Sequence, residues 1–305
     1  MKRIVSVSIG SSKRDHAVET EILGEQVRIE RIGTDGSMEK AIALIRELDG
    51  KVDAFGMGGI DLYLAAGRRR YVIRDAKRLA AAAKVTPIVD GSGLKNTLER
   101  RTVQELLAGG YPLAGKKVFV VCALDRFGLA ESLVDAGAEV VMGDFMFALG
   151  LPIPIRKLET LHLAASIIAP IAVQLPFQWL YPTGSAQESE NPKWAKWYHW
   201  ADIVAGDFLF IKKSLPKELP GKVILTNTTT SEDVADLRRR GVATLITTTP
   251  ELNGRSFGTN VMEALLVAFS GKPQAEITPE DYHVLLDRLG FKPRITELSQ
   301  TAPAA

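Results

Sequence analysis

The sequence has few of the residues that build disulfides and metal sites. It contains one cysteine, Cys122, and four histidines in 305 residues. A single cysteine excludes an intrachain disulfide and a multi-cysteine zinc site. With four histidines and a single cysteine, we predict no metal site.

Long hydrophobic runs and a large net charge are also missing. The most apolar segment, residues 161–175, is too short to span a bilayer and contains Pro170, so we expect a buried or interface helix there. Met1 leads almost directly into an apolar strand instead of a signal peptide, which predicts a cytoplasmic protein with no membrane partner. The formal net charge of +2 predicts no nucleic-acid partner.

Glycines are missing from the loop in which a dinucleotide site needs them. Residues 116–144 have the pattern of a strand, a loop, a helix, a second strand and a terminal acid. The loop has the sequence CALDRFG, where a dinucleotide site has G-x-G-x-x-G. With Gly128 aligned to the third glycine, Ala123 and Asp125 fill the first two positions, and the charge of Asp125 opposes a pyrophosphate.

Two interpretations of this segment stay open. It binds a nucleotide, with Arg126 offsetting Asp125 or pairing with a phosphate, or it is a purely structural β-α-β unit. Asp144 ends the second strand where an acid accepts ribose hydroxyls, which slightly favours NAD over NADP. The predicted cofactor-binding residues are Ala123, Asp125, Arg126, Phe127, Gly128 and Asp144, with Asn227, Thr228, Thr229 and Thr248 at later strand ends.

The pattern of strands and helices predicts an α/β protein of two domains. Residues 1–110 form an α/β substrate-binding domain, with a hairpin at Gly24-Glu25 and a helix capped by Ser37. In residues 111–295, short β-branched runs alternate with helices, which is typical of a Rossmann-like, doubly wound parallel sheet. We expect residues 296–305 to be a flexible tail.

Two further features belong to the second domain. The segment SEDVADLRRRG predicts a helix with Ser231 as N-cap and Gly241 as C-cap. A long insertion, residues 149–200, carries all four tryptophans. Because long insertions usually serve a function or an interface, we expect a possible homodimer through it.

Polar loops at strand ends of the first domain hold candidate site residues. The loop GSSKRDH, residues 10–16, either binds a carboxylate or phosphate or forms a solvated turn. In VDGSGLKNT, Lys95 and Asp90 are a candidate acid/base pair; alternatively, Asp90 caps the turn and Lys95 is exposed. Asp61 is a further carboxylate. The predicted substrate-binding residues here are Ser11, Ser12, Lys13, Arg14, Ser92, Asn96 and Thr97.

A third polar stretch is NGRSFGTN, residues 253–260. Arg255 can pair with a substrate carboxylate, and Asn260 can hydrogen-bond a hydroxyl. Alternatively, the stretch is a glycine-rich loop in which Thr259 caps the next helix.

Three stretches resemble the shikimate and quinate dehydrogenase family. KNTLERRTVQELLAGGYPLAGKKVFVV resembles its Asn-Thr-Asp element, with Asn96 and Thr97 matching, and DAGAEVVMGD resembles the run into its second Rossmann strand. NGRSFGTNVMEALLVAFSGKP resembles its closing helix, which returns toward the first domain and contributes a polar residue to the substrate. The resemblance implies NAD or NADP as cofactor and a small-molecule substrate, a hydroxylated carboxylate, in an interdomain cleft.

The predicted function is therefore an oxidoreductase. Lys95, with Asp90 or Asp61, would exchange the hydroxyl proton as a hydride leaves the substrate. Two alternatives stay open: a nucleotide- or phospho-metabolite-dependent transferase, and a noncatalytic ligand-binding protein that has lost the dinucleotide fingerprint.

Overall fold

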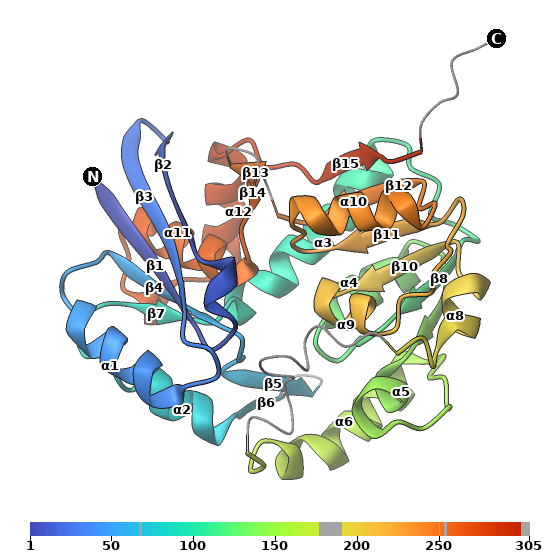
Figure 1. Cartoon of the computed structure of the whole chain (residues 1–305), viewed down its shortest axis with the longest axis horizontal. Coiled ribbons are helices and arrows are strands. Elements are labelled where there is room, and N and C mark those ends of the chain that lie inside the picture. Colours follow the sequence, from blue (N-terminus) through green and yellow to red (C-terminus); the bar gives the residue numbers. More distant parts are fainter. Residues whose placement is uncertain (67–68, 177–190, 250, 253–254, 300–305) are drawn as a thin grey trace. The chain divides into compact units, whose positions relative to one another are not determined.

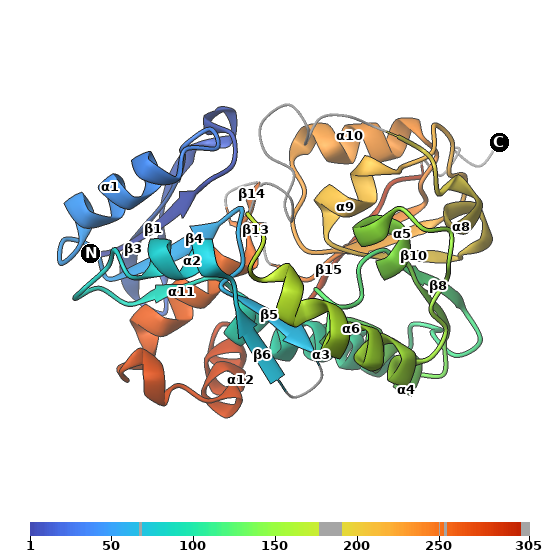
Figure 2. The ribbon, with the colours of Figure 1, turned by 90° about the horizontal axis from the view of Figure 1, so that it is seen from below.

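The computed structural model describes residues 1–66, 69–176, 191–249, 251–252 and 255–299. Contacts divide the chain into two compact units, each an α/β structure (Figures 1 and 2). Unit 1 comprises Met1–Thr97, Ala164–Glu188 and Phe257–Phe291, and unit 2 comprises Leu98–Leu163, Ser189–Ser256 and Lys292–Ala305. The first segment of unit 1 ends at Thr97, and residues 257–291 also belong to unit 1. The domain boundary at residue 110 stays a prediction.

Unit 1 contains a five-stranded sheet. Its strands are β1 (Lys2–Ser8), β2 (His16–Ile22), β3 (Glu25–Gly33), β4 (Ala54–Gly58) and β7 (Ile88–Val89), in the order β2-β3-β1-β4-β7. All neighbours are parallel except β2 and β3, which form the predicted hairpin. Its turn lies at Leu23 and Gly24, with φ of 51° and 81°, one residue before the expected position. Two positive φ angles are typical of a two-residue hairpin turn.

Helices cover both faces of this sheet (Figure 1). Alternate side chains of β1 explain the two layers: Val5 and Val7 pack in a core with α1 (Met38–Leu48) and α2 (Arg74–Ala80), while Ser6 points toward α11 (Thr259–Ser270). Ser37 caps α1 as expected. The remaining elements are α12 (Pro279–Arg288), the strand pair β5 (Tyr63–Ala66) and β6 (Arg69–Val72), and short 3-10 turns at Ser12–Arg14 and Gln274–Glu276. Helix α3 (Ser92–Ala108) begins in unit 1, and its residues from Leu98 onward belong to unit 2.

Unit 2 contains a six-stranded sheet in the order β15-β12-β11-β10-β8-β9. The strands are β8 (Lys117–Val120), β9 (Glu139–Met142), β10 (Ile203–Gly206), β11 (Val223–Thr226), β12 (Thr244–Thr247) and β15 (Arg294–Glu297). The first five are parallel and were all predicted from the sequence. Parallel sheets with helices in both units confirm the predicted α/β fold class.

Strand β8 shows why the unit 2 sheet is buried on both faces. Val118 and Val120 pack in one core, and Phe119 and Val121 pack in the other. Such apolar runs are typical of doubly wound sheets. The surrounding elements are α4 (Phe127–Asp135), α5 (Asp144–Leu149), α6 (Leu158–Ala172), α8 (Ala195–Trp200), α9 (Phe208–Lys213), α10 (Ser231–Arg239) and the strand pair β13 (Glu251–Leu252) and β14 (Arg255–Ser256).

Two details of unit 2 correct the sequence-based expectations. Thr230, not Ser231, is the N-cap of α10, because Asp233 completes a capping box with Thr230. The flexible tail was expected to begin at residue 296, but residues 296 and 297 form the end of β15, which pairs antiparallel with β12. Leu298, the next residue, is buried. Residues 300–305 lie outside the described part of the chain.

The described part of the insertion forms helices α6 and α8. Trp194 is buried, and the Trp197 ring stacks on Phe119 at 6.3 Å between ring centroids, so these tryptophans belong to the unit 2 core. Residues 177–190 lie outside the description. Three apolar side chains of α6 are exposed at four-residue spacing, Leu163, Ile167 and Ile171, and the homodimer stays a prediction. No helix among the described residues is long and apolar enough to cross a membrane.

Candidate functional site

The candidate catalytic residues of unit 1 follow the carboxyl ends of adjacent parallel strands. Gly10–Arg14 follows β1, Gly59–Asp61 follows β4, and Asp90 follows β7. Ligands of open α/β sheets bind at this edge. The first two loops approach closely, because a Cβ added at Gly59 would lie 3.1 Å from the backbone nitrogen of Gly10. Gly59 also has a φ of 76°, which favours glycine.

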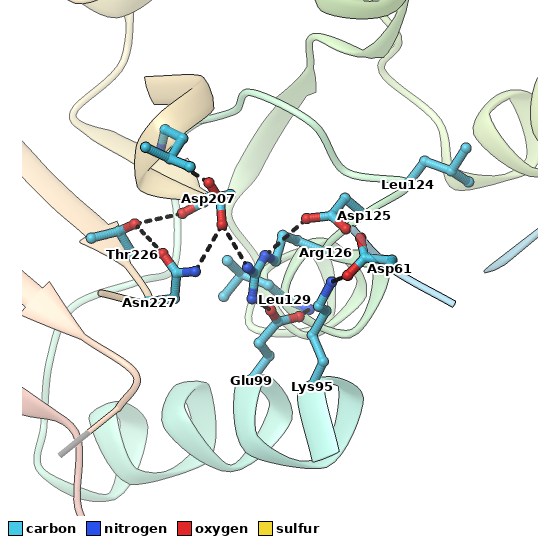
Figure 3. Close-up of polar contacts among 12 residues, drawn as sticks. Asp61, Lys95, Glu99, Leu124, Asp125, Arg126, Leu129, Asp207, Thr226 and Asn227 are labelled. Carbon is cyan, nitrogen blue, oxygen red and sulfur yellow. Dashed lines mark hydrogen bonds and ion pairs between the residues drawn. The ribbon is translucent and has the colours of Figure 1, made fainter. Parts of the chain in front are cut away.

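Lys95 and Asp61 form an ion pair at this edge (Figure 3). Lys95 Nζ lies 3.5 Å from Asp61 Oδ1, and the two side chains are 12% and 21% exposed. The first turn of α3 positions Lys95, whose backbone N–H donates to Gly91 O at 2.8 Å. An amine beside a carboxylate, both largely shielded from water, can exchange a proton with a bound hydroxyl group.

Asp90 holds the backbone close to both partners of this pair. Its Oδ2 accepts a hydrogen bond from Leu62 N at 2.5 Å, next to Asp61. Its Oδ1 accepts from Ser92 N at 3.0 Å and from Ser92 Oγ at 2.7 Å, at the start of the helix that carries Lys95. Asp90 thus makes the contacts of the turn cap, and the carboxylate beside Lys95 is that of Asp61.

A buried acid on α11 was missed by the sequence analysis. Glu263 is 4% exposed, and its Oε1 accepts a hydrogen bond from the Tyr282 hydroxyl at 2.8 Å. Burial, and to a smaller extent the charge of Asp90, raise the pKa of Glu263 to about 7. The hydrogen bond from Tyr282 and the N–H groups of Gly91 and Gly93 lower this pKa, but by less. The one signal in the sequence was a glutamate within the otherwise apolar run VMEALLVAF.

The loop at residues 10–16 is fixed by a second missed residue, Arg31 of β3. Arg31 donates to Ser11 O at 3.0 Å, to Asp15 Oδ1 at 2.7 Å and to Ser8 Oγ at 2.9 Å. Burial, and then the charge of Arg14, lower the pKa of Arg31 to about 10. Lys13 and Arg14 are exposed. The loop therefore holds two exposed cations, Lys13 and Arg14, whereas the buried Arg31 already pairs with Asp15.

Gly33 provides a test of this loop. A Cβ added at Gly33 would lie 2.7 Å from backbone atoms of Ser11 and Ser12. Because backbone cannot move aside as a side-chain tip can, Gly33→Ala is expected to lower the free energy of unfolding by about 1–3 kcal/mol. Urea unfolding measures this, with Gly109→Ala as the control, since its nearest contacts are at 3.3 Å or more. Equal stability of the two variants would contradict the close packing of the loop on β3.

The other predicted substrate residues have different surroundings. Asn260 Nδ2 donates to Ser6 Oγ at 2.8 Å and packs against Gly56, so it holds α11 on the sheet. On α3, Asn96 is exposed and Thr97 is buried. The side chain of Arg255 lies outside the described part of the chain.

In unit 2 the loop CALDRFG contains a buried arginine, Arg126, that contacts three carboxylates (Figure 3). Arg126 pairs with Glu99 of α3 at 2.7 Å, with Asp207 at the end of β10 at 2.9 Å, and with Asp125 at 3.2 Å. Burial alone would lower the pKa of Arg126, but the three carboxylates together raise it above its usual value. Glu99 was missed by the sequence analysis, because nothing in the local pattern links it to residue 126.

Polar residues at the neighbouring strand ends bond mainly to one another. Asn227 Nδ2 donates to Asp207 Oδ2 at 2.8 Å, and its Oδ1 accepts from Phe208 N at 3.2 Å. Thr249 Oγ1 donates to Asn227 O at 2.6 Å. Thr248 is buried, and Thr228 and Thr229 follow β11 at the same edge.

Asp144 contacts the same loop from the end of β9. Its carboxylate accepts hydrogen bonds from Ala123 N at 3.1 Å and Leu124 N at 2.8 Å. Burial raises the pKa of Asp144 to about 6, against the effect of these two N–H groups. The carboxylate expected at a ribose therefore bonds to the loop backbone.

These contacts allow a test of whether the loop suits a dinucleotide. In the usual geometry, loop N–H groups and a helix N-terminus bind the pyrophosphate. Here the first loop N–H groups bond to Asp144. Arg126 is shared among Glu99, Asp125 and Asp207, and these four residues, the Arg126 cluster, carry a formal charge of −2. The described residues do not fit a pyrophosphate in its usual position. Among them, no group of three or more His, Cys, Asp or Glu side chains is arranged to hold a metal ion.

Family comparisons cover both parts of the chain. Residues 93–298 match the family described as "Domain of unknown function (DUF8754)", and residues 3–90 match "Domain of unknown function (DUF8753)". Because the first match covers more than half of the sequence, the chain belongs to the DUF8754 family. A search among curated proteins found no match.

Solved structures show distant similarity only. A periplasmic solute-binding protein of an ABC transporter from Actinobacillus succinogenes 130z, with bound D-allose, has 10% identity over 98% of this chain and 99% of that chain, with a TM-score of 0.41. A glutamate dehydrogenase has 13% identity over 87% and 64%, with a TM-score of 0.39. Shikimate 5-dehydrogenase from Thermus thermophilus, in complex with NADP(H) and shikimate, has 13% identity over 95% and 100%, with a TM-score of 0.36. Similarity at this level does not assign a function.

Proposed function

We propose that the protein acts on a small hydroxylated carboxylate as an oxidoreductase of the shikimate and quinate dehydrogenase type. The observation that supports this most is the Lys95–Asp61 ion pair at the carboxyl-end edge of the unit 1 sheet. The substrate binds at this edge.

The pair supplies the acid/base part of such a reaction. When a secondary alcohol is oxidised, a base takes the hydroxyl proton as the hydride leaves the carbon. Lys95 exchanges this proton with the substrate, and Asp61 stabilises the ammonium group at 3.5 Å. Asp90 is a positioning residue, because it holds the backbone on both sides of the pair.

The loop at residues 10–16 is the proposed site for the substrate carboxylate. Lys13 and Arg14 are exposed there, and Arg31 fixes the loop backbone at Ser11. Charge-assisted hydrogen bonds from such cations are the usual means of binding a carboxylate.

A nicotinamide cofactor, NAD or NADP, would accept the hydride in this reaction. The CALDRFG loop does not fit its pyrophosphate in the usual position, so Lys95, Asp61 and the loop at residues 10–16 act at the proton and the carboxylate of the substrate.

A noncatalytic ligand-binding protein is the second candidate function. The observation that favours it is the pairing of Arg126 with Glu99, Asp125 and Asp207, at the strand ends where a cofactor usually binds. In that case unit 1 binds its ligand without oxidising it.

Thermal unfolding with ligands separates these functions. Quinate, shikimate, NAD, NADP and ATP are each added, and a ligand at 100 times its dissociation constant stabilises a protein by about 2.7 kcal/mol. Stabilisation by a hydroxylated carboxylate and by a nicotinamide cofactor supports the oxidoreductase. Stabilisation by the carboxylate alone supports the binding protein, ATP alone supports the transferase alternative, and no response to either carboxylate contradicts the leading proposal.

A further inference from the structure

The Arg126 cluster of unit 2 lies where the order of the sheet reverses. From β8 the chain passes to β9 on one side, and then returns to β10 on the other side of β8. The loops that follow β8 and β10 therefore lead to opposite sides of the sheet. In open α/β sheets the space between two such loops is the usual position of a ligand.

The guanidinium of Arg126 spans this position. It reaches Asp207, directly after β10, at 2.9 Å, although Arg126 belongs to the loop that follows β8. It also reaches Glu99 of α3 at 2.7 Å. The side chains of Arg126 and Glu99 are 5% and 2% exposed, so both charges are shielded from water.

Each carboxylate around Arg126 has a defined position. Asp207 accepts hydrogen bonds from Leu209 N and Asn227 Nδ2, at 2.9 and 2.8 Å. Glu99 Oε2 accepts from Leu129 N at 3.3 Å. Asp125 lies in the same loop as Arg126 and contacts Nε at 3.2 Å. The forked donors of arginine can reach several carboxylates at once, which the single ammonium group of lysine does less well.

We propose that Arg126 is the permanent occupant of the ligand position of unit 2. Its guanidinium fills this position, joins the loops after β8 and β10 to α3, and gathers three carboxylates whose negative charge keeps a pyrophosphate from this edge. The missing glycines of CALDRFG follow from this role, since no phosphate needs to approach the loop backbone. The inference goes beyond the proposed function, because it holds whether or not unit 1 is an enzyme.

Chemical rescue tests this inference in the full-length protein. Arg126→Ala removes the guanidinium and leaves Glu99 and Asp207 without their cation, which is expected to lower the unfolding temperature by roughly 10 °C. Guanidinium ion at low millimolar concentration should then raise the unfolding temperature of the variant by several degrees. Sodium and tetramethylammonium at equal ionic strength should have no such effect. The control Arg239→Ala, on the exposed surface of α10, should keep the wild-type unfolding temperature and show no guanidinium response.

A second variant covers the case in which Arg126→Ala does not fold. Arg126→Lys keeps the charge without the fork, and it should also unfold at a lower temperature than the wild type. NAD and ADP are titrated into the wild type and into this variant. No binding of NAD or ADP to either protein, or equal binding to the wild type and the variant, supports the inference. Wild-type unfolding temperatures for both variants, a rescue equal for all cations, or nucleotide binding weakened tenfold or more by Arg126→Lys would overturn it.

Discussion

Replacement of Lys95 by methionine is expected to lower the rate of substrate oxidation by roughly 10²- to 10⁴-fold. Methionine keeps an unbranched apolar stem of similar length on α3 but cannot exchange a proton. Because the proposed role is proton exchange, the loss should fall on the turnover number, with the Michaelis constant changed less than tenfold. Ketone formation from quinate or shikimate, in the presence of NAD or NADP, measures both constants.

Two further variants control this prediction. Lys84→Met removes an exposed lysine of unit 1 and should leave the rate unchanged. Asp61→Asn keeps the shape of the partner and removes its charge, so it should lower the rate less than the loss of Lys95 and shift the pH profile of turnover. Equal rates for Lys95→Met and Lys84→Met would remove Lys95 from the mechanism.

Glu263 is expected to give the stability of unit 1 a dependence on pH. The pKa of Glu263 is raised to about 7 in the folded protein, whereas an unfolded glutamate titrates near pH 4.3. Between these values the folded state holds a proton that the unfolded state has lost, so the free energy of unfolding falls as pH rises. The full difference is roughly 4 kcal/mol and is nearly complete one pH unit above the folded-state pKa.

The measurement is urea unfolding at pH 5, 6, 7 and 8, together with the 13C carboxyl shift of Glu263. Glu263→Gln keeps an acceptor for Tyr282 without a titrating proton, so its stability should lack this fall. Glu276→Gln, an exposed glutamate of the same unit, should follow the wild-type curve. A Glu263 carboxyl that titrates near pH 4.3 would contradict the burial argument.

The strands of unit 2 could be predicted because their residues are apolar on both faces. Runs such as KVFVV and KVILT leave little choice but a buried parallel strand. The cap of α10 was placed one residue late, because Thr230 and Ser231 both suit an N-cap, and only the box with Asp233 decides between them. The end of β15 was missed because a short edge strand has no strong pattern of its own.

For the candidate site, the sequence named the residues but not their pairing. Lys95, Asp90 and Asp61 were all named, but the sequence could not tell which carboxylate meets the amine, since β5, β6, α2 and β7 lie between Asp61 and Lys95. Arg126 has partners 27 residues before it and 81 residues after it. Local patterns carry no information about contacts at such separations.

Asp144 also shows that a local sequence pattern does not identify the hydrogen-bond partner of a side chain. The sequence predicted it as the last residue of the strand, whereas β9 ends at Met142 and Asp144 is the first residue of α5. A carboxylate at this position can accept hydrogen bonds from a ribose or from the loop backbone. Asp144 accepts them from the backbone N–H groups of Ala123 and Leu124.

The most direct test of the account is an NMR titration of the full-length protein with quinate and shikimate. The central claim is that the carboxyl-end edge of the unit 1 sheet binds a small hydroxylated carboxylate beside Lys95 and Asp61. The account predicts saturable shifts of the backbone amides of Ser11, Ser12, Asp61, Ser92 and Lys95. No shifts with either compound, or shifts confined to residues of unit 2, would contradict it.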